Sequence, residues 1–156
     1  FLKRILLLVS FKIIRIIGVN PIIGILSAPC NDGDWCSTWN GYINGYTSSY
    51  IFTSYIKWIE QAGGRVLPIL YNDNWDHIKQ VLPQLNGILF TGGGGGYDPE
   101  LPYFKMFDSI VDYLIEYARN NPDNVIPVWA TCLGFESLTS YISTNYQYTM
   151  SNCTAT

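Results

Sequence analysis

One cysteine lies where a short apolar run changes into a segment with helical spacing. Residues 125–129 have the length and the β-branched content of a buried strand. Apolar residues then recur at helical spacing from Leu133 onward, so Cys132 falls at the corner between strand and helix. This pattern predicts a nucleophile elbow with sulfur in place of the serine oxygen. The first N–H groups of the helix and its dipole would favour the thiolate, which is the reactive form of cysteine.

The small residues around Cys132 make the elbow interpretation as strong as a structural one. A single cysteine after an apolar strand is commonly a small buried hydrophobic residue. Ala130 and Gly134, two positions before and two after Cys132, have the small side chains that let an elbow turn close. On this segment alone both interpretations stay open.

Composition indicates one globular domain. The chain has 156 residues, of which 48% are hydrophobic and 13% are charged. A net charge of -3 argues against a nucleic-acid partner, because binding to phosphates needs clustered Lys and Arg. No metal site is predicted, since ligand spacing is absent, and no cofactor is expected.

The first 19 residues differ from the rest and resemble a signal-like leader, with a basic start and a short apolar core. An amphipathic or mistranslated leader is the alternative. The segment is too short and too interrupted by charge for a stable membrane span. Cys30 and Cys36 could pair with each other or with Cys153, and Asn152 begins a glycosylation sequon. These features favour a secretory route.

The remaining chain alternates between predicted strands and helices. Strands are predicted at residues 21–26, 65–70, 86–90 and 125–129. The first predicted helix runs from Ser48 or Ser49 to Ala62 and follows a long loop at 27–47. Further helices are predicted at 75–82 after an Asn74 cap, at 104–118 and after Cys132. The alternation predicts an α/β fold: a three-layer, flavodoxin-like parallel sheet with helices on both faces. Pro68 favours an edge or a strand end for its strand.

Two further features, a glycine run and a histidine, could take part in chemistry. Five glycines, Gly92 to Gly96, follow the third predicted strand, at the sheet end where Cys132 is expected. They are either a flexible turn or a segment whose backbone N–H groups approach a reacting oxygen, and no P-loop lysine follows them. His77 is the single histidine, and its place inside the short second helix predicts a surface or capping residue.

Four ordered segments resemble the folate gamma-glutamyl hydrolase family, within the class I glutamine-amidotransferase-like fold. They read N-P-I-I-G-I-L (20–26), S-Y-I-K-W-I-E-Q-A-G-G-R-V-L-P-I (54–69), N-G-I-L-F-T-G-G (86–93) and P-V-W-A-T-C-L-G-F-E (127–136). The resemblance covers residues 20–156 and corresponds to the N-terminal part of such a domain, with the C-terminal part missing.

The resemblance implies a secreted, lysosomal or vacuolar cysteine hydrolase. Its substrate would be a small molecule, folylpoly-gamma-glutamate, from which it cuts gamma-linked glutamates. The resemblance carries the nucleophile onto Cys132 and the oxyanion hole onto the backbone N–H groups of Leu133 and of Gly92 or Gly93. Tyr55 matches a family tyrosine near the substrate. A homodimer is compatible with this interpretation.

Two departures from the family pattern are visible. Ala130 replaces a glycine, a change that we expect to strain the elbow. The family histidine, in a Trp-His-Pro-Glu type motif, falls in the missing C-terminal part, so we expect a fragment that does not hydrolyse amides at a useful rate. The alternatives are a truncated non-catalytic paralogue that retains glutamate binding, and a flavodoxin-like binding module. Glu136 matches the family motif without an assigned role.

Overall fold

The computed structural model describes residues 20–30, 49–93 and 100–145. The predicted leader, Cys36, the glycines after Gly93 and the sequon at Asn152 lie outside these ranges.

A parallel sheet of four strands forms the centre of the described structure. The strands are β1 (Ile22–Leu26), β4 (Arg65–Ile69), β5 (Gly87–Phe90) and β6 (Val128–Ala130), arranged in the order β4-β1-β5-β6. Every neighbouring pair in this sheet is parallel. The four predicted strands and the predicted α/β class are therefore confirmed.

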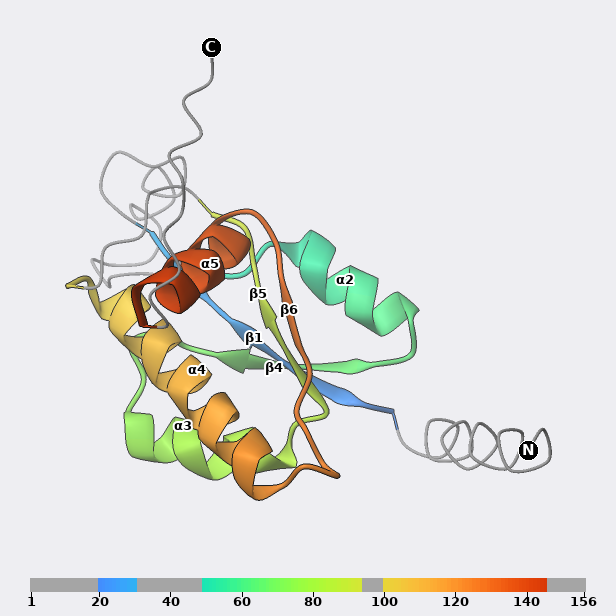
Figure 1. Ribbon diagram of the computed structural model, residues 1–156. Helices are drawn as coiled ribbons and strands as arrows, with labels where there is room; N and C mark the ends of the chain where they lie inside the picture. The colour runs from blue at the N-terminus through green and yellow to red at the C-terminus, as the bar shows by residue number, and fades with distance from the viewer. Residues whose placement is uncertain (1–19, 31–48, 94–99, 146–156) are drawn as a thin grey trace, which may run out of the picture.

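Helices cover both faces of this sheet. Figure 1 shows α3 (Trp75–Val81), α4 (Pro102–Asn120) and α5 (Leu133–Asn145) together on one face, and α2 (Thr53–Gln61) on the other. No helix in the described ranges combines the length and the apolar content needed to span a bilayer.

The main core lies between the sheet and the three-helix face. The helix α4 contributes a continuous apolar stripe, as the helical spacing predicted. The buried side chains of this stripe are Tyr103, Phe104, Met106, Phe107, Ile110, Val111 and Leu114. From the sheet, Leu26, Ile88 and Phe90 join the same cluster. Because strand side chains alternate, the neighbouring Ile25 and Leu89 are buried on the α2 face instead.

Local signals explain where two helices begin and end. The Asn74 side chain accepts a hydrogen bond from the Asp76 N–H at 2.7 Å, which confirms the predicted cap of α3. Gly63 has a φ of 85° directly after α2, a conformation that ends helices and suits glycine.

The predicted start of the first helix was wrong. Ser49 and Tyr50 form the short strand β3 (Ser49–Tyr50), which pairs antiparallel with β2 (Ala28–Pro29), and α2 begins only at Thr53. The pairing also places a strand inside the segment predicted as a loop. Capping propensity is a local signal, and here the backbone pairing between distant residues outweighs it.

The prediction of a buried fourth strand was also wrong in part. The strand β6 contains three residues, and Val128 and Trp129 are 38% and 60% exposed. It lies at one edge of the described sheet. Ala130 packs against the main core, whereas Trp129 contacts Trp58 of α2, with ring centroids 6.1 Å apart. At the opposite edge, β4 accommodates Pro68 as predicted.

Candidate active site

The pairing of β5 with β6 brings the glycine segment to the cysteine. Phe90 pairs with Ala130, and the Thr131 N–H continues the ladder by donating to the Phe90 carbonyl at 3.1 Å. Two residues beyond that pair, Gly92 lies beside Cys132. A Cβ atom added at Gly92 would be 3.1 Å from the Cys132 Cβ and 3.8 Å from its Sγ. Parallel register therefore assembles the site at the carboxyl end of the sheet.

Cys132 has the backbone of a nucleophile elbow. Its φ is 49°, the only positive φ among the described non-glycine residues, and its thiol is free and exposed. A left-handed conformation costs an L-residue about 1 kcal/mol, so the surrounding turn must enforce it. That Ala130 adds strain to this turn stays a prediction.

Gly134 closes the turn. Its N–H donates to the carbonyls of Thr91 at 3.1 Å and of Thr131 at 3.0 Å. A Cβ at this position would lie 2.6 Å from the Phe90 carbonyl oxygen and 2.7 Å from the Phe90 Cβ. Only a glycine lets the first turn of α5 rest this closely on the end of β5, which agrees with the small residue that the elbow pattern requires.

Among the described residues that adjoin Cys132, the backbone N–H groups of Leu133 and Gly93 are candidate donors. Leu133 is the first residue of α5, so its N–H has no acceptor within the helix. In the described residues no acceptor is bonded to the Gly93 N–H, and the Gly93 carbonyl lies 4.0 Å from the Cys132 Sγ. The Gly92 N–H, in contrast, donates to the Tyr55 hydroxyl at 3.1 Å. Of the two predicted glycines, only Gly93 has an N–H that is not bonded to an acceptor within the described part of the chain.

Tyr55, which the resemblance places near the substrate, lies next to the elbow, and its hydroxyl is bonded to residues of the elbow and of the glycine segment. Its hydroxyl accepts from the Gly92 N–H and also from the Thr131 hydroxyl, each at 3.1 Å. Sequence reasoning missed Thr131, although strand alternation from Trp129 places it on the α2 face. It also missed Tyr50, whose hydroxyl lies 3.8 Å from a Cβ added at Gly93. The position of Tyr50 depends on the β2–β3 pairing, for which the sequence carried no signal.

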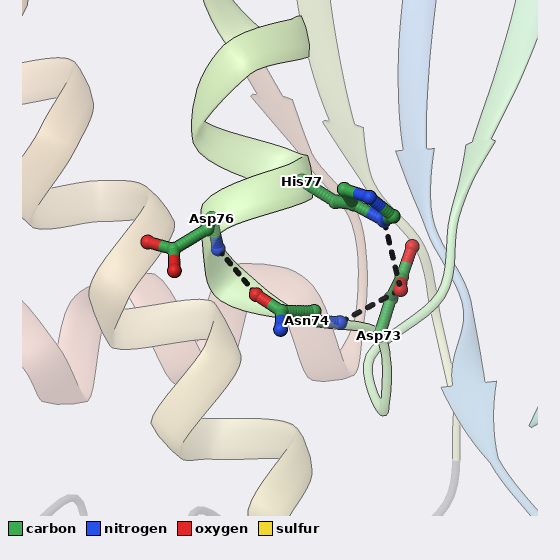
Figure 2. A network of polar contacts seen from close by, with 4 residues as sticks. All are labelled: Asp73, Asn74, Asp76 and His77. Carbon is green, nitrogen blue, oxygen red and sulfur yellow. Dashed lines mark hydrogen bonds and ion pairs between the residues drawn. The ribbon is translucent and has the colours of Figure 1, made fainter.

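His77 does not belong to this site. Figure 2 shows it on α3, facing Asp73 in the loop before the helix, with Nδ1 and Oδ1 3.9 Å apart. Its side chain is 77% exposed, which confirms the predicted surface location. It lines a cavity of about 330 Å³ along β4, whereas Cys132 follows β6 at the other edge of the described sheet. Three strand spacings, roughly 14 Å, separate those edges.

Among the residues that the structure describes, no side-chain partner gives Glu136 a role. Glu136 is exposed in the first turn of α5, and its backbone N–H donates to the Cys132 carbonyl at 2.9 Å. Within the described ranges no three His, Cys, Asp or Glu side chains gather as metal ligands would. Cys30 is disulfide-bonded.

The elbow and the glycine segment lie in a region that matches a known protein family. Residues 21–147 match the model of the peptidase C26 family, a span that includes the elbow and the Gly92–Gly93 segment. The chain belongs to the peptidase C26 family. Among curated proteins, this peptidase C26 chain is similar to gamma-glutamyl hydrolase B of Dictyostelium discoideum, with 36% identity over 86% of the chain and 36% of the relative. It is 37% identical to gamma-glutamyl hydrolase 1 of Arabidopsis thaliana, over 83% of the chain and 34% of the relative.

A human relative shows the same partial coverage. The gamma-glutamyl hydrolase of Homo sapiens is 34% identical over 79% of the chain and 35% of its own length. The chain thus spans about a third of the length of the curated relatives it matches, within the peptidase C26 region.

The geometry predicts that Cys132 is the most reactive thiol of the protein. It is the one described cysteine that is free and exposed, and it lies at the N-terminus of a helix. Limiting iodoacetamide near neutral pH, followed by peptide mass mapping, is expected to label Cys132 first. Labelling of the unfolded, reduced protein is the control and should be even. Preferential labelling of Cys30, Cys36 or Cys153 in the folded protein would contradict the elbow.

Proposed function

We propose that this chain carries the nucleophile and the oxyanion hole of a thiol hydrolase for gamma-glutamyl bonds. The observation that carries the proposal is the backbone at Cys132, which has a φ of 49° between β6 and α5 and presents an exposed thiol. The kind of bond that we propose is cleaved comes from the similar proteins, each of which is named a gamma-glutamyl hydrolase.

The proposed reaction starts with attack by the Cys132 thiolate on the gamma-carbonyl carbon. The carbonyl oxygen becomes an oxyanion in the tetrahedral intermediate. The intermediate then collapses to a gamma-glutamyl thioester and expels the leaving amine, which must take up a proton. Water hydrolyses the thioester, which releases the gamma-carboxylate and restores the thiol.

The oxyanion hole is assigned to the N–H groups of Leu133 and Gly93. The two residues that carry these N–H groups are neighbours, since a Cβ added at Gly93 would lie 3.0 Å from the Leu133 Cδ2. Backbone donors fixed before the reaction can stabilise the developing charge without reorganising. The N–H of Gly92 is left out of this hole because the Tyr55 hydroxyl already accepts from it.

The substrate proposed is a folylpoly-gamma-glutamate, a small molecule, with Tyr55 and Tyr50 beside the reacting bond. We also propose a secreted, lysosomal or vacuolar location, which the disulfide at Cys30 supports because such bonds persist in oxidising compartments.

A suitable test substrate must not need a proton donor for its leaving group. The single histidine of the sequence is His77, on α3 and remote from the elbow. An amide leaving group needs a proton donor, but a nitrophenolate leaves without one. An N-acetyl-glutamate gamma-(para-nitrophenyl) ester therefore isolates attack by Cys132 and the oxyanion hole.

We expect this ester to release one equivalent of nitrophenol in a rapid burst. The matched control is the isomer that carries the ester on the alpha-carboxyl group, which should acylate the protein at least about tenfold more slowly if the site selects gamma-linked carbonyls. Equal bursts from the two isomers, or no burst, would contradict gamma-glutamyl specificity. No burst is also what a non-catalytic paralogue predicts.

A further inference from the structure

A single hydroxyl group connects three parts of the candidate active site. Tyr55 lies in the first turn of α2, and its hydroxyl oxygen is 3.1 Å from the Gly92 nitrogen and 3.1 Å from the Thr131 Oγ1. Gly92 follows β5 and Thr131 follows β6, immediately before Cys132. One side chain from the opposite face of the sheet therefore joins the ends of two neighbouring strands at the point where the nucleophile begins.

Steric contacts make this junction tight. A Cβ added at Gly92 would lie 3.0 Å from the Tyr55 hydroxyl and 3.1 Å from the Cys132 Cβ. Position 92 is therefore confined between the tyrosine and the nucleophile. A shift of the Gly92 backbone would therefore also change where Gly93 lies relative to the thiol.

The two hydrogen bonds to the Tyr55 hydroxyl hold the ends of β5 and β6 in place, and neither of them involves the substrate. The Gly92 N–H occupies one acceptor position of the Tyr55 hydroxyl, and the Thr131 hydroxyl occupies the other. Both contacts are partly buried, where a hydrogen bond holds its groups better than it does in bulk water.

We propose that Tyr55 and Thr131 are positioning residues that set the distance between the Cys132 thiolate and the Gly93 N–H donor. The inference rests on the proposed function, since it concerns the oxyanion hole of that reaction. Neither residue needs to touch the reacting atoms. Their effect reaches the reaction through the Gly92 backbone, and small errors in such placement are costly to a rate.

The proposal predicts different effects on two reactions of the same sulfur. Acylation by the gamma-nitrophenyl ester passes through an oxyanion, whereas alkylation by iodoacetamide displaces iodide and forms none. We expect Tyr55→Phe to lower the acylation rate constant about tenfold, while the alkylation rate changes less than about twofold. Thr131→Val should behave like Tyr55→Phe, and Thr131→Ser, which keeps the hydroxyl, should restore acylation.

Two further variants sharpen the test. Tyr113→Phe is the matched control, because Tyr113 is half-buried on α4, stacks on Tyr117 and is remote from Cys132; both rates should stay unchanged. The double variant Tyr55→Phe with Thr131→Val should acylate no more slowly than either single variant, since both substitutions disrupt one network. Equal losses in both reactions, or additive losses in the double variant, would overturn the positioning role.

A readout without substrate keeps this inference separate from the proposed function. The Gly92 amide loses its acceptor in Tyr55→Phe, so its hydrogen exchange measured by NMR should accelerate at least about tenfold, with no change in Tyr113→Phe. Unchanged Gly92 exchange would overturn the inference whatever the activity. Faster Gly92 exchange in Tyr55→Phe, combined with no acylation of the unsubstituted protein, would support the inference and contradict the proposed function instead.

Discussion

Cys132→Ser is expected to abolish the acylation burst, with a fall of at least about 10³-fold in the rate constant. The substitution keeps the size of the side chain and its place between β6 and α5. A serine hydroxyl remains protonated near neutral pH, and the described residues around the elbow include no histidine to take its proton. The helix terminus at Leu133 favours an anion by only about 1 kcal/mol, too little to activate an alcohol.

The measurement is nitrophenol release under single-turnover conditions. Thermal unfolding of Cys132→Ser should match that of the unsubstituted protein, which separates loss of the nucleophile from loss of the fold. Tyr113→Phe serves again as the control with normal acylation. A burst of normal rate from Cys132→Ser would mean that another side chain attacks the ester.

Gly134→Ala is expected to have the largest effect on the fold of the site. The added methyl group would lie 2.6 Å from the Phe90 carbonyl oxygen and 2.8 Å from the Phe90 carbonyl carbon. Backbone atoms cannot move aside as the end of a flexible side chain can, so α5 must shift away from β5. We expect a loss of about 3 kcal/mol in the free energy of unfolding, or roughly 6–12 °C in Tm, and acylation at least tenfold slower.

Ser140→Ala provides the comparison for Gly134→Ala. Ser140 lies on the same helix, and no hydrogen bond from its side chain is present within the described ranges. Its replacement should change stability by less than about 0.5 kcal/mol, measured by urea unfolding. If Gly134→Ala were as stable as Ser140→Ala, the close packing of α5 against the end of β5 would be contradicted.

The elements that sequence analysis predicted well are those with strong periodic signals. The apolar face of α4 and the continuous apolar runs of β1 and β5 specify their own type, and their alternation with helices specifies a parallel sheet. The position of Cys132 at a strand-to-helix corner followed from the same signals. Its closeness to Gly92 then follows from parallel strands that end together.

The features that were missed depend on contacts between residues far apart in the chain. Ser49 has the side chain of a helix cap, but it pairs with Pro29 across a two-stranded sheet. The hydrogen bonds of Tyr55 need the exact register of β5 against β6, which no local pattern specifies. The exposure of Trp129 likewise depends on what covers β6, and apolar content alone does not reveal this.

The central claim is that the sulfur of Cys132 attacks a gamma-glutamyl carbonyl. Its most direct test is intact and peptide mass spectrometry of the protein quenched in acid during reaction with the N-acetyl-glutamate gamma-ester. The account predicts one added N-acetyl-glutamyl group, located on the peptide that contains Cys132 and removed by hydroxylamine as a thioester should be. An adduct on any other residue, or an unmodified Cys132 while nitrophenol is released, would contradict it.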